Sequence, residues 1–152
     1  MVKNSVSGVD ANDTRISINK LDHVSIAVPN LAEAIELFTS NFQCKASSPK
    51  EIPEQGVRIA YINMGMSKLE LMEPLAGSSP IAKFLDRHPM GGIHHLCLST
   101  PDIDSALQKL KDSKIKVLGK EPPQPGHHGK KIVFTNPKDT LGSLLEIEEV
   151  QS

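Results

Sequence analysis

The fold of this chain is decided by the stretch Gly91-Gly92-Ile93-His94-His95-Leu96-Cys97-Leu98. Two adjacent histidines lie in an apolar run that ends before Pro101, a pattern typical of a short strand. Successive strand side chains point to opposite faces, so only one of the two histidines is expected to face a given pocket. A His-His pair is by itself a weak indication of a metal site, and a second copy of the pattern is what strengthens it.

An internal repeat supplies that second copy. His23 corresponds to His95 and Pro29 to Pro101, a shift of 72 residues (95 − 23). Two copies imply one supersecondary unit used twice. The same alignment pairs Asp22 with His94, so we expect His95 to face the site and His94 to point away from it.

The ends of the two copies also correspond once four extra residues are allowed in the second. Leu69-Glu70-Leu71-Met72-Glu73 then matches Leu145-Glu146-Ile147-Glu148-Glu149. Each copy therefore carries a histidine near its start and a glutamate near its end. A pseudo-twofold axis between the copies would bring two histidines and two glutamates to a common point.

Each copy is predicted to fold as a βαβββ unit. In the first, Asn30 caps a helix over 31–41; in the second, Asp102 caps the corresponding helix. A linker holds a short helix capped by Ser79. The predicted strands are 21–28, 43–46, 57–64 and 68–72 in the first unit, and the His95 strand, 115–118, 131–135 and 143–149 in the second.

These elements predict an α+β fold in which two tandem βαβββ modules, each with a four-stranded sheet, curl together into a mixed sheet around a metal-binding cleft, with the helices on the outer faces. Residues 20–150 form a single domain in this interpretation: module 1 (20–74), the linker with its helix (75–90) and module 2 (91–150). Residues 1–19 are polar and lack apolar periodicity, so they are interpreted as a flexible leader or the remnant of a targeting segment.

Composition excludes several classes of function. Hydrophobic residues make up 38% of the 152 residues and charged residues 23%, which is ordinary for a globular protein. A net charge of −1 gives no reason to expect nucleic acid or an anionic membrane as partner. No apolar run approaches the ~18 residues needed to cross a bilayer. The two cysteines, Cys44 and Cys97, are too few for a disulfide scaffold and suit a reducing compartment.

The paired residues predict metal chemistry. Two neutral imidazoles and one or two carboxylates suit a divalent ion of intermediate hardness, such as cobalt, manganese, nickel or zinc. Glu70 and Glu146 each lie between apolar neighbours, so burying those neighbours on one face turns the glutamate toward the cleft. The protein supplies at most four ligands, which leaves positions open on an octahedral ion for substrate oxygens.

Several motifs carry a resemblance to a known family. They are Leu21-Asp22-His23-Val24, Pro53-Glu54-Gln55-Gly56-Val57, Ser79-Pro80-Ile81-Ala82, Gly91-Gly92-Ile93-His94-His95, His128-Gly129-Lys130, Pro137-Lys138-Asp139 and Leu145-Glu146. Together they resemble the methylmalonyl-CoA epimerase family of the vicinal-oxygen-chelate (glyoxalase) superfamily, over about residues 20–149. The Pro-Glu-Gln-Gly and Gly-Gly-Ile-His-His blocks make the resemblance specific to the epimerases within that superfamily.

The resemblance implies an activity. Such an enzyme interconverts (2R)- and (2S)-methylmalonyl-CoA by proton abstraction at carbon 2 through a metal-stabilised enolate, in propionyl-CoA and branched-chain catabolism. Co²⁺ is the first expectation for the metal, with Mn²⁺, Ni²⁺ and Zn²⁺ as alternatives, and neither nicotinamide nor flavin is needed. The resemblance further implies a homodimer, in the mitochondrial matrix if the chain is eukaryotic and otherwise in the cytoplasm.

The resemblance also assigns roles to residues. His23, His95, Glu146 and Glu70 are the expected metal ligands, and Glu146 and Glu70 the expected catalytic acid–base pair on opposite faces of the substrate. Some members of the family carry an amide at the position of Glu70 and a carboxylate at that of Ile59; Ile59 cannot act as a base, so Glu70 is the alternative. Lys130 and Lys138 are candidates for binding the substrate carboxylate or the CoA phosphates. No ligand role is assigned to His127 or His128.

Three other functions stay open at this stage. The chain could be another metal-dependent member of the superfamily, such as a glyoxalase I-type lyase. It could be a metal-free binding module on the same fold, or a structural homodimer with a vestigial site. The complete set of His23, His95 and Glu146 argues against the last two.

Overall fold

One mixed sheet organises the molecule. The computed structural model describes residues 12–76, 79–119, 121–126 and 128–151. Within these residues nine strands form a continuous sheet in the order β2-β3-β4-β1-β5-β9-β8-β6, with β7 paired to β8. The strands are β1 (Lys20–Ala27), β2 (Lys50–Ile52), β3 (Val57–Asn63), β4 (Lys68–Pro74), β5 (Gly92–Thr100), β6 (Val117–Leu118), β7 (Gln124–Pro125), β8 (Lys131–Thr135) and β9 (Leu145–Glu149).

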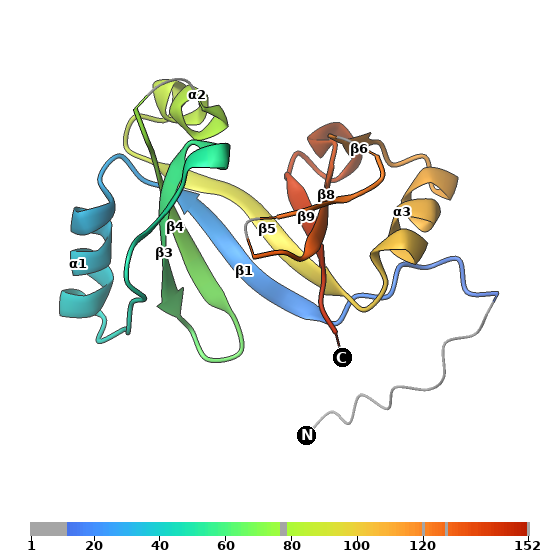
Figure 1. Ribbon diagram of the computed structural model, residues 1–152, viewed down its shortest axis with the longest axis horizontal. Coiled ribbons are helices and arrows are strands. Elements are labelled where there is room, and N and C mark those ends of the chain that lie inside the picture. The colour runs from blue at the N-terminus through green and yellow to red at the C-terminus, as the bar shows by residue number, and fades with distance from the viewer. Residues whose placement is uncertain (1–11, 77–78, 120, 127, 152) are drawn as a thin grey trace.

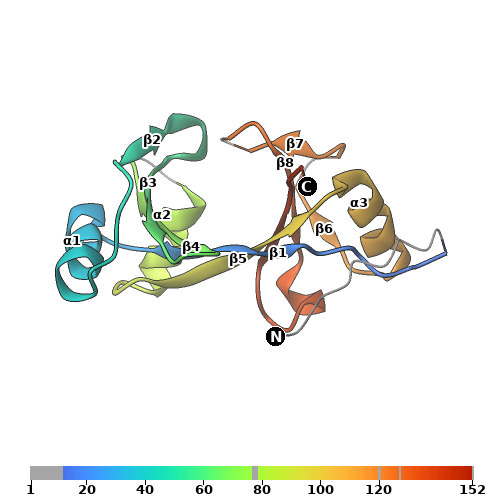
Figure 2. The same cartoon turned by 90° about the horizontal axis from the view of Figure 1, so that it is seen from below.

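The sheet is continuous because β1 and β5 pair with each other. They run antiparallel, with Val24 opposite Leu96, and these two residues are equivalent in the repeat. Figure 1 shows β1 and β5 crossing the middle, with α1, β3 and β4 on one side and α3, β8 and β9 on the other. Seen from below in Figure 2, β2–β3 and β7–β8 rise on the same side of this central pair. The two modules therefore join in one curled mixed sheet, as the predicted α+β fold of two tandem modules requires.

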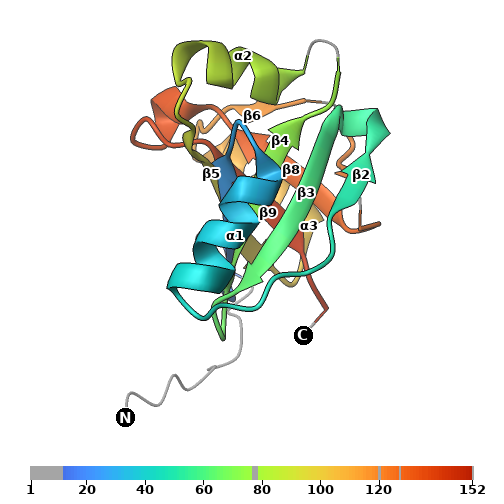
Figure 3. The same ribbon diagram turned by 90° about the vertical axis from the view of Figure 1, so that its left-hand side faces the viewer.

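Two helices cover the outer faces, as the repeat predicts. They are α1 (Leu31–Asn41) and α3 (Ile103–Asp112). The Asn30 and Asp102 side chains cap them, each accepting a hydrogen bond from the backbone N–H three residues later, and each such cap is worth about 1 kcal/mol. α1 lies in front of the sheet in Figure 3 and packs over Ile62 and Leu71.

A second pair of capping contacts ties each outer helix to a strand. The Glu73 carboxylate accepts from the Leu31 N–H at 2.8 Å, and the Glu149 carboxylate accepts from the Ile103 N–H at 3.0 Å. Both glutamates occupy the fifth position of the repeated strand motif. The repeat therefore includes the hydrogen bond that holds each helix N-terminus to its strand. The negative charge of the carboxylate also complements the positive end of the helix dipole.

The linker helix α2 (Pro80–Arg87) begins as predicted, with the Ser79 Oγ accepting from the Ala82 N–H. Its Ile81 joins a core cluster with β3 and β4 residues. After α2 the chain turns at Gly91, whose φ is +89°. A Cβ at Gly91 would lie 2.5 Å from the Ala27 carbonyl oxygen, so only glycine allows the start of β5 to approach β1 this closely.

One strand prediction was wrong, and two short strands were missed. Residues 43–46 form no strand: Ala46 makes an isolated bridge to Ile62, and the edge strand is instead β2, three residues long. The short strand β7 was not predicted, because Gln124 and Pro125 carry no alternating pattern.

The segment before β1 touches module 2. Ile16 packs partly against the α3 cluster, and the Lys109 ammonium donates to the Arg15 carbonyl at 2.9 Å. In the described part of the chain, no helix has the length and apolar character needed to cross a membrane.

Candidate active site

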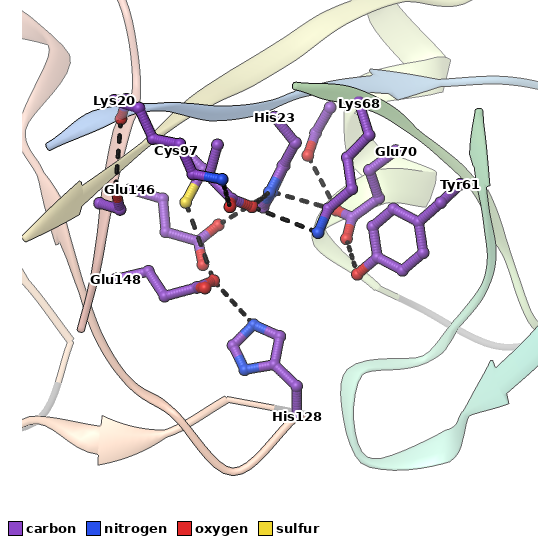
Figure 4. A network of polar contacts seen from close by, with 12 residues as sticks. Lys20, His23, Tyr61, Lys68, Glu70, Cys97, His128, Glu146 and Glu148 are labelled. Carbon is purple, nitrogen blue, oxygen red and sulfur yellow. Dashed lines mark hydrogen bonds and ion pairs between the residues drawn. The ribbon is translucent and has the colours of Figure 1, made fainter. Parts of the chain in front are cut away.

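Four residues singled out by the repeat lie together at the centre of the sheet. They come from the four middle strands: His23 from β1, Glu70 from β4, His95 from β5 and Glu146 from β9. All four are buried. The two imidazole centroids are 5.8 Å apart, and donor atoms of His23, Glu70 and His95 lie within 4.8 Å of one another. Figure 4 shows His23 between the two glutamates.

His23 presents a bare nitrogen to the cluster. Its Nδ1 lies 2.8 Å from a carboxylate oxygen of Asp22, which accepts the Nδ1–H; in the neutral imidazole this arrangement leaves Nε2 without a proton. Nε2 is buried and has no hydrogen-bond partner among the described residues. The nearest acidic atoms, Oε1 of Glu70 and Oε2 of Glu146, are each 3.8 Å away. A buried imidazole nitrogen without a partner is costly unless something binds it.

Asp22 is itself held as a carboxylate. Burial acts to raise its pKa, but the hydrogen bond from His23 and the nearby ammonium groups of Lys68 and Lys20 outweigh burial, and the pKa falls below its ordinary value. An ionised Asp22 keeps the imidazole of His23 in the required orientation.

Glu70 is fixed by two hydroxyl groups. The Ser25 Oγ donates to Oε1 and the Tyr61 hydroxyl donates to Oε2, both at 2.8 Å. Burial, followed by the charge of Glu70, raises the pKa of Tyr61 well above its usual range, so the phenol stays a donor. Each carboxylate oxygen keeps a second lone pair for a proton or a metal ion.

His95 and Glu146 form the other half of the cluster. Nε2 of His95 lies 2.8 Å from Oε2 of Glu146 and 2.9 Å from the Ser25 Oγ. Ser25 therefore bridges the histidine of module 2 and the glutamate of module 1.

The prediction that His94 points away from the cleft was wrong. Both His94 and His95 line one cavity of about 270 Å³, with Glu70, Glu146 and Phe134. The ladder between β1 and β5 slips by one residue between Ser25 and Ile26, so His94 is the extra residue of a bulge. A bulge breaks strict alternation and sends neighbouring side chains toward the same side. Burial lowers the pKa of His94 to about 4, so its ring is neutral at pH 7.

The cluster has the chemistry of a divalent metal site. Ligand atoms about 2.0–2.2 Å from one ion can stand no more than about 4.4 Å apart, and the 3.8 Å separations around Nε2 of His23 satisfy this limit. The partnerless nitrogen is the atom that an ion would satisfy. The donor set of His23, Glu70 and His95 thus fits a metal ion, and Glu146 lies beside it, 3.8 Å from Nε2 of His23 and 2.8 Å from Nε2 of His95.

A third buried glutamate was missed by the sequence analysis. Glu148 lies where the repeat has Met72 in module 1, and its oxygens contact Nε2 of His128 at 2.8 Å and the Lys130 ammonium at 3.0 Å. Burial acts to raise its pKa, but these two partners outweigh burial and lower it. Glu148 lies two residues after Glu146 and therefore on the same face of β9, which strand alternation could have indicated.

The predicted substrate lysines differ in position. Lys130 lies at a cavity of about 360 Å³ beside His23, where it pairs with Glu148. Lys138 is exposed in the 3₁₀ turn Pro137–Asp139 and is not among the described residues lining that cavity or the one beside His95. His127 lies outside the described residues. Next to the His23 cavity, a further cavity of about 450 Å³ is lined by Lys20, Lys45 and Lys68.

Comparison with known proteins places this chain in a family. The family model of the glyoxalase/bleomycin resistance protein/dioxygenase superfamily matches residues 22–134. The ethylmalonyl-CoA/methylmalonyl-CoA epimerase of Cereibacter sphaeroides is 41% identical over 133 residues, which cover 88% of this chain and 99% of that protein. The chain belongs to the methylmalonyl-CoA epimerase family. The mitochondrial methylmalonyl-CoA epimerase of Homo sapiens is 39% identical, over 88% of this chain and 75% of the human protein.

Solved structures of the epimerase family agree. A Streptomyces coelicolor methylmalonyl-CoA epimerase variant in complex with 2-nitronate-propionyl-CoA has a TM-score of 0.81 and 30% identity, covering 90% of this chain and 100% of that chain. The family and the glyoxalase fold predicted from the sequence motifs are thus confirmed.

Proposed function

We propose that this chain is a metal-dependent epimerase that interconverts the (2R) and (2S) forms of methylmalonyl-CoA by moving the proton at carbon 2. The observation that carries the proposal is Nε2 of His23, which has no hydrogen-bond partner in the described part of the chain and has one glutamate from each module 3.8 Å away. Relatives that carry the epimerase name cover most of this chain, which favours this activity over a glyoxalase I-type lyase.

The metal ion would be held by His23, His95, Glu70 and Glu146, and Co²⁺ is the first candidate, ahead of Mn²⁺, Ni²⁺ and Zn²⁺. When bound, the metal ion would supply positive charge near the thioester and carboxylate oxygens of the substrate. The chain prepares this place by orienting His23 through Asp22 and by keeping both histidines buried.

Glu70 and Glu146 are the proposed proton-transfer groups. Inversion at carbon 2 needs an acid–base group on each face of a planar enolate, and these two carboxylates come from opposite modules on either side of His23. Ser25 and Tyr61 hold Glu70 in place, so its position is set before substrate arrives. One glutamate would take the proton and the other would return one from the far side.

The lysine-lined cavity indicates which end of the site would bind the anionic CoA part of the substrate. It shares Asp22, Ser47, Tyr61 and Lys68 with the cavity beside His23, so the two cavities are adjacent. We place the phosphates of CoA near Lys20, Lys45 and Lys68. Lys130 remains the candidate for the substrate carboxylate, for which it would exchange its contact with Glu148. Lys138 is retained as a weaker candidate because it lies outside both cavities.

The decisive experiment follows deuterium uptake at carbon 2 of methylmalonyl-CoA in heavy water. The purified protein, supplied with Co²⁺, should exchange that proton and interconvert the epimers, and a chelator should stop both processes. In parallel, the protein is given the hemithioacetal of methylglyoxal and glutathione. Turnover of the hemithioacetal without exchange at carbon 2 would establish the lyase and exclude the epimerase.

The assembly and the compartment are further parts of this proposal. We propose a homodimer, supported by exposed apolar side chains that a partner subunit could cover, such as Met90, Ile93 and Leu141. Light scattering after size exclusion would measure it. Because the human relative is named as mitochondrial, we propose the mitochondrial matrix for a eukaryotic source and otherwise the cytoplasm.

A further inference from the structure

We propose that His94 is a positioning residue: when Nε2 of His95 holds a metal ion, Nδ1 of His94 accepts the Nδ1–H of His95 and so keeps Nε2 directed at the ion. This inference rests on the proposed function, since it concerns how one of the proposed metal ligands is held. It extends that proposal by giving a role to a histidine that is neither a proposed metal ligand nor a proposed proton-transfer group.

The geometry that carries the inference is a contact between the two rings. Nδ1 of His94 lies 2.9 Å from Nδ1 of His95, and the rings meet nearly edge to face at 80°. A neutral imidazole has one N–H and one acceptor nitrogen, so at this distance one of the two nitrogens donates and the other accepts. Without a metal ion, Nε2 of His95 contacts the Glu146 carboxylate and the Ser25 Oγ, whose proton goes to Glu70, so Nε2 of a neutral His95 carries the proton and His94 donates. When Nε2 of His95 acts as a ligand, its proton must be on Nδ1, and His94 is then the acceptor.

Module 1 contains the equivalent arrangement with different chemistry. Asp22, the repeat partner of His94, accepts from Nδ1 of His23 at 2.8 Å. Asp22 is also the extra residue of a bulge, since Leu21 pairs with Leu98 and His23 pairs with Cys97. Each module thus uses a bulge to turn the residue before its ligand histidine onto that histidine. A partner on the far nitrogen is what fixes the tautomer of a metal-binding histidine.

The ring of His94 is itself held in place. It is half-buried, and the Phe84 ring packs against it at 5.2 Å between centroids, from helix α2. Phe84 in turn contacts the His88 ring on its other side at 4.5 Å. These contacts fix the acceptor nitrogen without a charge, which suits a site that already holds two carboxylates.

The test separates the acceptor from the bulk of the ring. His94→Asn places an amide oxygen where Nδ1 was, whereas His94→Phe keeps a ring but removes the acceptor. His88→Phe is the matched control, because it changes a histidine on the other side of Phe84 that does not contact His95. Co²⁺ is titrated into each full-length protein by calorimetry. We expect His94→Phe to bind Co²⁺ about 10–100-fold more weakly, and His94→Asn and His88→Phe to stay within about threefold of the unaltered chain.

A spectroscopic measurement on the unaltered protein keeps the inference testable if a variant does not fold. In the Zn²⁺-loaded protein, ¹⁵N NMR should show the proton of His95 on Nδ1 and a coupling across the hydrogen bond to Nδ1 of His94. A proton-free Nδ1 on His95 would overturn the inference, as would equal Co²⁺ binding by His94→Phe and the unaltered chain, or equally weak binding by His94→Asn and His94→Phe. An unaltered chain that takes up no Co²⁺ or Zn²⁺ defeats the metal proposal first, and this inference with it.

Discussion

Replacing Glu70 by glutamine should separate proton transfer from metal binding at the candidate site. Glutamine has the same length and keeps one carbonyl oxygen, but it cannot take a proton from carbon 2. The carboxylate of Glu70 accepts one hydrogen bond on each oxygen, from Ser25 and from Tyr61. In Glu70→Gln one of these hydroxyls must accept from the new N–H₂ group, which it can do by rotating.

The two consequences differ in size. Rearranging one hydroxyl contact costs on the order of 1 kcal/mol, so the variant should fold and melt near the unaltered protein. Losing a positioned acid–base group costs about 10²–10⁴-fold in rate. That range equals about 2.7–5.4 kcal/mol in the activation barrier, at 1.36 kcal/mol for each factor of ten. The loss of epimerisation should therefore far exceed the loss of stability.

The assay follows each epimer separately in heavy water, with Co²⁺ bound. If Glu146 still serves its own face, Glu70→Gln should exchange the carbon 2 proton of one epimer without inverting it. Glu73→Gln is the matched control, since Glu73 is on the same strand but contacts Arg58 and the α1 N-terminus. We expect the control to epimerise within about twofold of the unaltered enzyme.

Two results would refute this reasoning. Epimerisation by Glu70→Gln within threefold of the unaltered enzyme would remove Glu70 from the proton-transfer pair. Equal loss of exchange from both epimers, together with loss of Co²⁺ binding, would make Glu70 a metal ligand with no separate role in moving protons.

Four other outcomes are expected. Tyr61→Phe should lower kcat about threefold to tenfold with little change in KM, because one oxygen of Glu70 loses its donor; steady-state kinetics measures it. Glu148→Gln should lower the free energy of unfolding by about 1–3 kcal/mol near pH 7. The pKa of Glu148 is depressed in the folded protein, so its stabilisation is present above the ordinary value of 4.5 and is lost as pH falls through the folded-state pKa. Urea unfolding from pH 3 to 7 would measure this loss. Lys45→Glu should raise KM severalfold for the CoA thioester but not for a short thioester lacking phosphates, as parallel kinetics with the two substrates would show. Chelation should lower the melting temperature by on the order of 10 °C, since a metal at 1,000 times its Kd adds about 4 kcal/mol, and calorimetry with and without Co²⁺ would measure the shift.

The sequence was sufficient to predict the four central residues because the repeat carries three-dimensional information. His23 and His95 are equivalent positions of the repeat, and their strands pair with Val24 opposite Leu96. Equivalent residues of the two copies therefore lie close together in the sheet. The helices were predictable for a different reason. Their caps, Asn30 and Asp102, are local contacts that need no tertiary structure.

What could not be predicted depends on contacts between strands. Strict strand alternation predicts that the His94 side chain points away from the cleft. Only the pairing of β1 with β5 reveals the bulge that directs it toward the cleft. The edge strand was misplaced because a three-residue strand such as β2 is defined by its partner β3 rather than by its own pattern. The sequence indicated Lys130 only as a candidate for binding the substrate, because nothing in its pattern revealed the buried counter-charge, Glu148, that the structure gives it.

The pairing of β1 with β5 also bears on how the molecule could be assembled. Each module supplies one imidazole and one glutamate, and the strands of the two modules meet through backbone hydrogen bonds, while the peptide that joins them passes α2 and turns at Gly91, outside the cluster. Continuity of the polypeptide is therefore not what holds the centre together. Two separately synthesised fragments, divided between His88 and Gly91, would carry every group needed to rebuild it, and neither fragment alone would contain more than half.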